Sequence, residues 1–195
     1  MAQFILCGYL IDGTGQPPMR DAFLEVADGL IVRVGSQARM PVSQGKETLD
    51  LREHTVMPGL IDCHDHLYLD MEDEQAQALE PDTWSILRAA RNARAKLAIG
   101  ITTLREMGGK NYTDVMLQKA INSGLVPGPR LLVSGKVLVR TGGHGWLDSE
   151  EVDGVDEVRK GVRKQVRAGA NLIKVMVSGG ETTPGSDSSR QDLAD

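Results

Sequence analysis

Two histidines stand two positions apart in the stretch PGLIDCHDHL, residues 58–67, directly after an apolar run. Side chains alternate between the two faces of a strand, so His64 and His66 would project from one face and Asp65 from the other. Two imidazoles one pleat apart can both bind a single divalent cation at about 2.0–2.1 Å. The alternative interpretation is a pair of surface histidines near a turn, because this short motif is common by itself.

A lysine lies within the apolar run LIKVMVS, residues 172–178. In a strand that is buried on both faces, a charged ammonium carries a large desolvation penalty unless it is neutral or paired. Burial lowers the pKa of a lysine, and a neutral amine can add carbon dioxide to become a carbamate, an anionic ligand with two oxygens. Lys174 is therefore a second candidate ligand. The alternative is an edge position with the ammonium in water.

The segments around these residues alternate between strand-like and helix-like patterns. The expected strands are 59–67, 101–107, 129–139 and 170–180, and the expected helices are 82–100, 113–124 and 155–169. Each expected helix ends at a glycine, which is a common residue just after a helix. Single helices between strands predict βαβ units and a parallel sheet. Because such folds bind ligands at the C-terminal ends of their strands, this arrangement favours a metal site at His64 and His66.

The N-terminal 57 residues have a different pattern, which is typical of short strands. Within residues 21–35, two apolar runs are joined by Asp28 and Gly29, and this dipeptide predicts a hairpin. A segment of this size is about as small as an independently stable unit can be. We therefore expect residues 1–57 to form part of a small β domain, and residues 58–195 to form a separate α/β region.

Composition excludes several classes of protein. A formal charge of −5 provides no basic surface for nucleic acid or anionic membranes. No apolar run approaches the roughly 18 residues of a membrane span, and the N-terminus lacks the features of a signal peptide. The two cysteines, Cys7 and Cys63, do not suggest a disulfide framework. We expect a cytoplasmic protein whose partners are neither nucleic acid nor membrane.

Five stretches of the chain resemble the amidohydrolase superfamily in their order and spacing, and especially its prolidase and imidazolonepropionase-like branch. These stretches are MPGLIDCHDHL, GITTLREMGG, GPRLLVSG, TGGHG and GANLIKVMVSGG. The resemblance covers nearly the whole chain, including DGTG near the N-terminus. It implies that residues 58–195 form the first half of a (β/α)8 TIM-type barrel, with about four βα units. Part of a small, incomplete β-sandwich domain, residues 1–57, would precede it.

The resemblance also implies roles for individual residues. His64 and His66 would bind the more buried of two divalent ions, with zinc expected, and a carbamylated Lys174 would bridge the two ions. His144, in TGGHG, would line the substrate pocket and contact the scissile carbonyl or a substrate carboxylate. The alternative for His144 is a histidine on a glycine-rich surface loop.

Other positions depart from the family pattern. Glu106 stands where the branch more often has aspartate, and we expect Arg105 and Glu106 to be structural. The family's remaining metal ligands are histidines of the fifth and sixth strands and an aspartate of the eighth. No histidine follows Lys174, and the aspartate, which is also the general base, is expected beyond residue 195. We therefore expect a truncated chain, or half of an assembly completed by a second copy or by a missing C-terminal half.

This pattern predicts a metal-dependent hydrolase of amide or peptide bonds in small substrates, acting through a metal-activated water. A prolidase-like dipeptidase or an N-acyl amino acid hydrolase is the favoured type, and a cyclic-amide hydrolase of the imidazolonepropionase type is an alternative. Two other possibilities remain open: a non-catalytic metal-binding or assembly fragment, and a metal-free structural unit in which His64 and His66 face solvent. The sequence does not identify the substrate.

Overall fold

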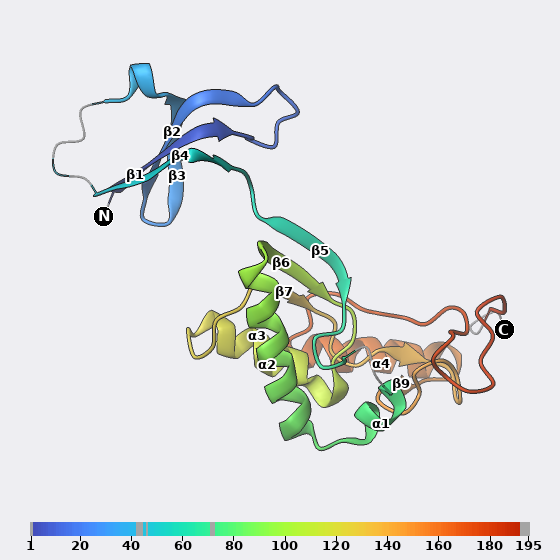
Figure 1. Cartoon of the computed structure of the whole chain (residues 1–195). Helices are drawn as coiled ribbons and strands as arrows, with labels where there is room; N and C mark the ends of the chain where they lie inside the picture. Colours follow the sequence, from blue (N-terminus) through green and yellow to red (C-terminus); the bar gives the residue numbers. More distant parts are fainter. Residues whose placement is uncertain (1, 42–44, 46, 71–72, 192–195) are drawn as a thin grey trace. The chain divides into compact units, whose positions relative to one another are not determined.

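The computed structural model describes residues 2–41, 45, 47–70 and 73–191 of the chain. The chain divides into two compact units, residues 1–58 and residues 59–195 (Figure 1). Each unit has its own cluster of buried apolar side chains. No helix among the described residues is long and apolar enough to cross a membrane.

The first unit contains a four-stranded sheet with the strand order β3-β2-β1-β4. The strands are β1 (Ala2–Leu10), β2 (Met19–Ala27), β3 (Leu30–Ser36) and β4 (Glu47–Val56), with a short 3-10 helix, η1 (Gln37–Arg39), after β3. Strand β1 is antiparallel to β2 and parallel to β4. Asp28 and Gly29 join β2 to β3 with φ values of 51° and 78°. Positive φ at both positions is what a two-residue hairpin turn requires, so the predicted hairpin is confirmed.

Aromatic and aliphatic side chains of the first two strands form the core of this unit. Phe4 and Phe23 pack edge to face with ring centroids 6.0 Å apart. Cys7 is fully buried beside Leu10 and Leu24, and it is a free thiol, as is Cys63 in the other unit.

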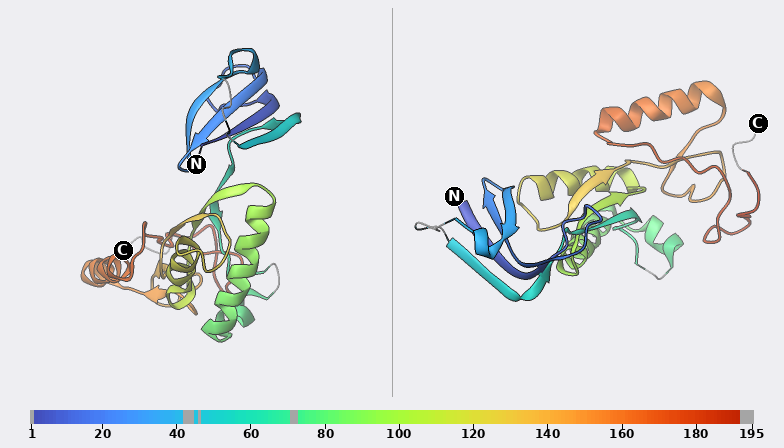
Figure 2. Two further views of the ribbon diagram at one scale, coloured as in Figure 1. Left: turned by 90° about the vertical axis from the view of Figure 1, so that its left-hand side faces the viewer. Right: turned by 90° about the horizontal axis from the view of Figure 1, so that it is seen from above.

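The second unit is built on a parallel three-stranded sheet, β5-β6-β7. The strands are β5 (Leu60–Asp65), β6 (Ile101–Glu106) and β7 (Arg130–Val133). Two helices connect them in sequence, α2 (Asp82–Ala98) and α3 (Thr113–Asn122), and two shorter elements precede these helices, α1 (Glu74–Leu79) and η2 (Lys110–Tyr112). Helices α2 and α3 lie side by side against the sheet (Figure 1, Figure 2). The predicted βαβ arrangement is confirmed over these three strands.

Small side chains let α2 approach the sheet closely. Ala89 and Ala93 of α2 are buried with Leu104 of β6, Leu117 of α3 and Leu131 of β7 in one cluster. Burial of an aliphatic side chain of leucine size contributes about 1.5–3 kcal/mol, so this cluster is the main apolar contribution to holding β5, β6 and β7 in place.

The chain beyond β7 forms a smaller substructure. A two-residue parallel pair joins β8 (Leu138–Val139) to β9 (Glu150–Glu151), and helix α4 (Gly154–Ala168) packs over it. Gly161 of α4 faces Leu138 so closely that an added Cβ would lie 3.0 Å from the leucine side chain. Gln165 is fully buried, accepts a hydrogen bond from the Lys136 N–H and donates one to Glu150. The predicted strand at 129–139 is thus divided into β7 and β8.

The predicted strand at 170–180 is not a regular strand, and the sequence-based expectation was wrong there. The Leu138 N–H donates to the Lys174 carbonyl, the Met176 N–H donates to the Leu138 carbonyl, and each bond measures 2.9 Å. These bonds form one isolated parallel bridge between Leu138 and Val175. Because β8 has only two residues, it provides too short a ladder to extend this pairing. The segment is extended beside β8 without becoming a strand.

Candidate active site

The two motif histidines lie at the C-terminal end of β5. His64 is within the strand and His66 is one residue beyond it. The His64 N–H donates to Asp62 Oδ1 at 3.1 Å, and the His66 N–H donates to Asp65 Oδ1 at 2.9 Å. The imidazole centroids are 5.3 Å apart, with the ring planes inclined at 63°. The structure therefore brings the two rings together at the edge of the sheet where parallel folds bind ligands.

The spacing of the rings fits two imidazoles bound to one metal ion. With a metal–nitrogen distance of about 2.0–2.1 Å and roughly 1.1 Å more to each ring centre, tetrahedral binding places the centroids about 5 Å apart. Burial lowers the pKa of both imidazoles, and the neighbouring Lys174 charge lowers them further. The lowered pKa favours the neutral imidazole, which is the form that binds metals.

Lys174 is partly buried in the extended segment beside β8. Burial lowers its pKa, and the charge of Arg105 lowers it further. Because the Lys174 charge affects the pKa of both His64 and His66, its ammonium lies within electrostatic reach of both rings. Across residues 2–41, 45, 47–70 and 73–191, the Lys174 side chain has no hydrogen-bond or ion-pair partner. A free amine of lowered pKa suits the predicted carbamate, which stays a prediction.

Asp65 faces away from this group. Its carboxylate lies 2.6 Å from the Lys96 ammonium on α2, and Asp62 lies 3.4 Å from the same ammonium. Alternation of side chains along β5 accounts for Asp65 but not for Asp62, which is two residues from His64. The β5–β6 register shifts between Asp62 and Asp65, and both carboxylates lie near Lys96. Within the described part of the chain, no three His, Cys, Asp or Glu side chains are grouped closely enough to hold a metal. A third ligand would therefore be Lys174 or a residue outside this group.

Glu106, at the end of β6, lies next to His66 and was expected only as a structural residue. Its Oε2 atom accepts a hydrogen bond of 2.9 Å from the Leu67 N–H. Its Oε1 atom lies 4.0 Å from His66 Nδ1, and neither atom has a hydrogen-bond partner among the described residues. The side chain is only 1% exposed, and burial raises its pKa well above the usual range. This contact could not be predicted from local patterns, because it depends on the β5–β6 register, which places Asp65 opposite Glu106.

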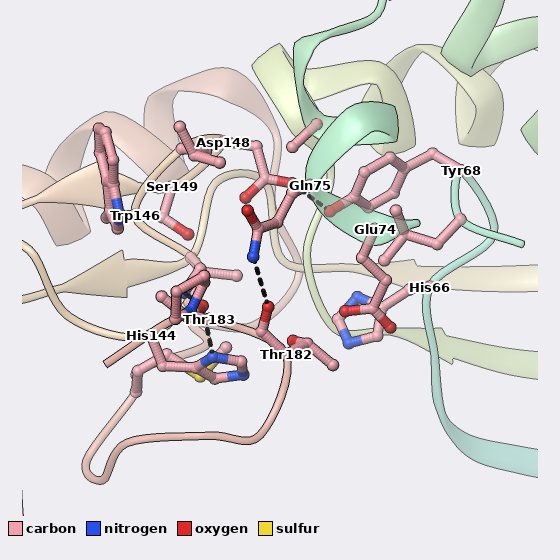
Figure 3. Close-up of a pocket in the computed structure, with 17 residues that line it drawn as sticks. His66, Tyr68, Glu74, Gln75, His144, Trp146, Asp148, Ser149, Thr182 and Thr183 are labelled. Atoms are coloured by element: carbon pink, nitrogen blue, oxygen red, sulfur yellow. Dashed lines mark hydrogen bonds between the residues drawn. The ribbon is translucent and has the colours of Figure 1, made fainter. Parts of the chain in front are cut away.

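A cavity of about 460 Å³ lies beside His66 (Figure 3). Most of its lining residues come from the turn after His66 and from α1, from the loop between β8 and β9, and from the segment after Lys174. Figure 3 shows His66, Tyr68 and Glu74 on one side, and His144, Trp146 and Thr183 on the other. Aromatic side chains mixed with a few polar groups are typical of small-molecule sites.

His144 lines the wall of this cavity across from His66 (Figure 3). Its Nδ1 atom lies 2.9 Å from Thr183 Oγ1, and the same hydroxyl accepts a hydrogen bond from the Gly145 N–H at 2.9 Å. Gly180 packs against the ring, because an added Cβ there would lie 2.4 Å from the imidazole. The histidine is therefore held on both sides, although its loop is rich in glycine. Its role toward a substrate stays a prediction.

Tyr68 and Asp148 connect two walls of the cavity. The Tyr68 hydroxyl donates a short hydrogen bond to Asp148 Oδ2 (Figure 3). Burial, and then the Asp148 charge, raise the pKa of Tyr68 well above its usual range. The tyrosine stays a protonated donor and fixes the turn after His66 against the loop between β8 and β9. In the sequence, Tyr68 looks like one more apolar residue after the motif, so neither residue was predicted.

Comparisons with known proteins identify relatives of this chain. A family model described as "Amidohydrolase family" matches residues 55–189. The ochratoxinase of Aspergillus niger is 36% identical over 90% of this chain. A solved prolidase complexed with N-methylphosphonate-L-proline matches the whole chain at 29% identity with a TM-score of 0.90. A Xaa-Pro dipeptidase with bound methionine in its active site matches 92% of the chain at 28% identity with a TM-score of 0.83.

The chain covers only part of each of these relatives. It spans 42% of the ochratoxinase, 51% of the prolidase and 48% of the Xaa-Pro dipeptidase. The matched part includes the strand with the two histidines and the segment with Lys174, which both lie within residues 55–189.

Proposed function

The chain belongs to the amidohydrolase family, and we propose that it supplies part of a metal-dependent hydrolase site that acts on the amide bonds of small substrates. The pair of imidazoles at 5.3 Å carries this proposal. The pair lies at the C-terminal end of a parallel strand, has the separation of two ligands on one ion, and adjoins a cavity of about 460 Å³.

His64 and His66 would hold a divalent ion, with zinc as the expected metal, and Lys174 would be a third ligand as a carbamate. When bound, such an ion lowers the pKa of a water molecule and polarises a carbonyl group. The residues of this chain would orient the substrate. His144 presents its Nε2 edge to a group in the cavity while Thr183 holds its Nδ1 edge. The Tyr68–Asp148 bond keeps the cavity wall in position during binding.

Small dipeptides and N-acyl amino acids are the proposed substrates. A volume of about 460 Å³ is sufficient for a molecule of this size. The two solved relatives, one a prolidase and the other a Xaa-Pro dipeptidase, support the dipeptide class. The selection between a dipeptide and an N-acyl amino acid would also depend on the part of the relatives that this chain does not cover.

Metal analysis tests the metal site directly. Purified protein equilibrated with zinc should retain the ion, and the double variant His64→Ala/His66→Ala should lose it. His54→Ala is the matched control, because His54 is an exposed histidine on β4 in the other unit. Equal zinc content in the double variant and the wild type would refute the assignment. Hydrolysis of dipeptides and N-acyl amino acids by a polypeptide extended over the rest of the relatives' barrel then tests the reaction.

A further inference from the structure

We propose that Glu106 is a positioning residue, which fixes the ring orientation and the tautomer of His66 so that Nε2 is free to bind a metal ion. The inference rests on the proposed metal site and deepens it, because it assigns a role to a residue outside the ligand set. Glu106 reaches His66 from the neighbouring strand β6, and so links two strands of the sheet at the site.

The geometry shows two unpaired atoms that face each other. Glu106 Oε1 and His66 Nδ1 are 4.0 Å apart, about 1 Å beyond a hydrogen bond, and neither has a partner among the described residues. The carboxyl group is 1% exposed, so bulk water does not solvate Oε1. A buried acceptor without a partner is costly, and the imidazole edge is the group that can satisfy it. A relative shift of about 1 Å would bring the two atoms within hydrogen-bonding distance.

The chemistry of a histidine ligand explains why this contact matters for metal binding. A neutral imidazole carries one proton, so binding through Nε2 requires that the proton sit on Nδ1. Metal-binding histidines usually donate this second N–H to a carboxylate, a carbonyl or water, and such a partner fixes both the tautomer and the ring orientation. As a carboxylate, Glu106 places Oε1 where it can accept a hydrogen bond from the His66 Nδ1–H, so that the proton stays on Nδ1.

A purely structural role is the competing explanation. Glu106 Oε2 already accepts the Leu67 N–H at 2.9 Å, and this bond alone would hold the turn after β5. The Gly108 backbone also lies beside the same edge of the His66 ring and is a competing partner for it. A substitution that preserves the Leu67 bond and the Gly108 backbone, but changes the group that faces Nδ1, separates these explanations.

Glu106→Gln is that substitution. The Leu67 N–H needs an acceptor, so the amide oxygen takes the Oε2 position and the NH2 group faces His66. An NH2 group donates, and His66 must then accept through Nδ1, which moves the imidazole proton to Nε2 and blocks the metal-binding nitrogen. The substitution has nearly the same shape as the native side chain and retains the backbone contact. It therefore leaves the fold intact and reverses the tautomer.

The experiment measures zinc affinity by calorimetry, together with thermal unfolding, on the whole chain. Glu106→Gln should weaken zinc binding by about 10–100-fold, the usual effect of losing such a partner, with an unfolding temperature close to that of the wild type. Asp62→Asn is the matched control. It removes another negative charge near His64, but among the described residues Asp62 is bonded to the His64 backbone N–H and paired with Lys96, not with an imidazole. We expect the control to change zinc affinity by about fivefold or less.

A nitrogen-15 spectrum of the histidines provides a second readout. In the zinc-bound wild type, His66 should show a slowly exchanging, downfield Nδ1 proton, and in folded Glu106→Gln this signal should be lost. Zinc affinity of Glu106→Gln equal to that of the wild type would overturn the proposal. If the variant does not fold, the spectrum of the zinc-bound wild type tests the proposal. Absence of a protected Nδ1 proton on His66 in that spectrum would overturn the proposal. Failure to hydrolyse amides with zinc still bound would count against the proposed reaction alone.

Discussion

The Nδ1 atom of His144 lies 2.9 Å from the hydroxyl oxygen of Thr183, a residue 39 positions further along the chain. The same oxygen accepts the Gly145 N–H, so one hydroxyl holds both the ring and the backbone of the glycine loop. This contact turns a loop that is flexible by composition into a defined wall of the cavity. It also directs the Nε2 edge of His144 away from Thr183.

Thr183→Val should therefore destabilise this wall. Valine has the same shape but provides no partner for His144 Nδ1 or for the Gly145 N–H, and loss of a partly buried hydrogen bond typically costs about 0.5–1.5 kcal/mol. Urea unfolding measures the change. Thr182→Val is the control, because within the described part of the chain Thr182 makes its hydrogen bond through the backbone carbonyl, as the acceptor for Gln75. Equal losses in the two variants would mean that the Thr183 hydroxyl does not hold the loop.

The two motif histidines should titrate below the ordinary histidine range in the metal-free protein. Burial lowers the pKa of both rings in the folded state, whereas the unfolded chain binds protons from about pH 6.5 downward. Their contribution to stability is therefore fully present above pH 6.5, and it is lost as the pH falls through the lowered folded-state values. With a chelator present, the free energy of unfolding of the wild type should fall more steeply below pH 6.5 than that of His64→Gln/His66→Gln. Parallel curves of unfolding free energy against pH for the two proteins would contradict the lowered pKa values of His64 and His66.

The charge of Lys174 should contribute to these lowered values. Lys174→Met removes a positive charge within reach of both rings, so the pKa of His64 and the pKa of His66 should both rise. Proton NMR titration of the metal-free protein measures both. Lys160→Met, on the exposed side of α4, is the control and should leave both titrations unchanged. An unchanged His66 titration in Lys174→Met would show that the ammonium points elsewhere.

Much of the architecture followed from local patterns in the sequence. The expected helices at 82–100 and 113–124 match Asp82–Ala98 and Thr113–Asn122 closely, because glycine and apolar periodicity mark helix boundaries well. The fold class is confirmed by likeness to solved amidohydrolases, of which the chain covers about half. The prediction of a strand at 170–180 was wrong because a strand needs a paired neighbour. An apolar run in the sequence does not show how long that neighbour is.

The site was predictable only where its residues belong to motifs. His64, His66 and Lys174 were chosen from short patterns, and the structure brings them within electrostatic reach of one another. Glu106 was expected to be structural, and its contact with His66, like the contact of Thr183 with His144, was not predicted for a physical reason. Each acts through a contact set by strand register or by packing between distant segments, and neither has a distinctive local pattern. Residues that position metal ligands through such contacts are harder to predict from sequence than the ligands themselves.

The last prediction is that this chain alone does not hydrolyse amides at an enzymatic rate. A catalytic zinc generally has three protein ligands and a positioned water, whereas the described residues provide two imidazoles and, if carbamylated, Lys174. Two of the carboxylates near the imidazoles are already engaged, because Asp65 is paired with Lys96 and Glu106 is buried against Leu67. The family's general base is expected on a later strand. Absence of a general base typically costs 10²–10⁴-fold in rate.

The assay compares this chain with a polypeptide extended over the remainder of the relatives' barrel. Both receive zinc, bicarbonate and the same panel of dipeptides and N-acyl amino acids. The extended polypeptide should turn over at least about 10²-fold faster, because it adds the ligands and the base that the family places on its later strands. Zinc content measured in parallel separates a chain that lacks the metal from one that binds it without turnover. Comparable rates for the two polypeptides would show that the residues described here already form a complete site.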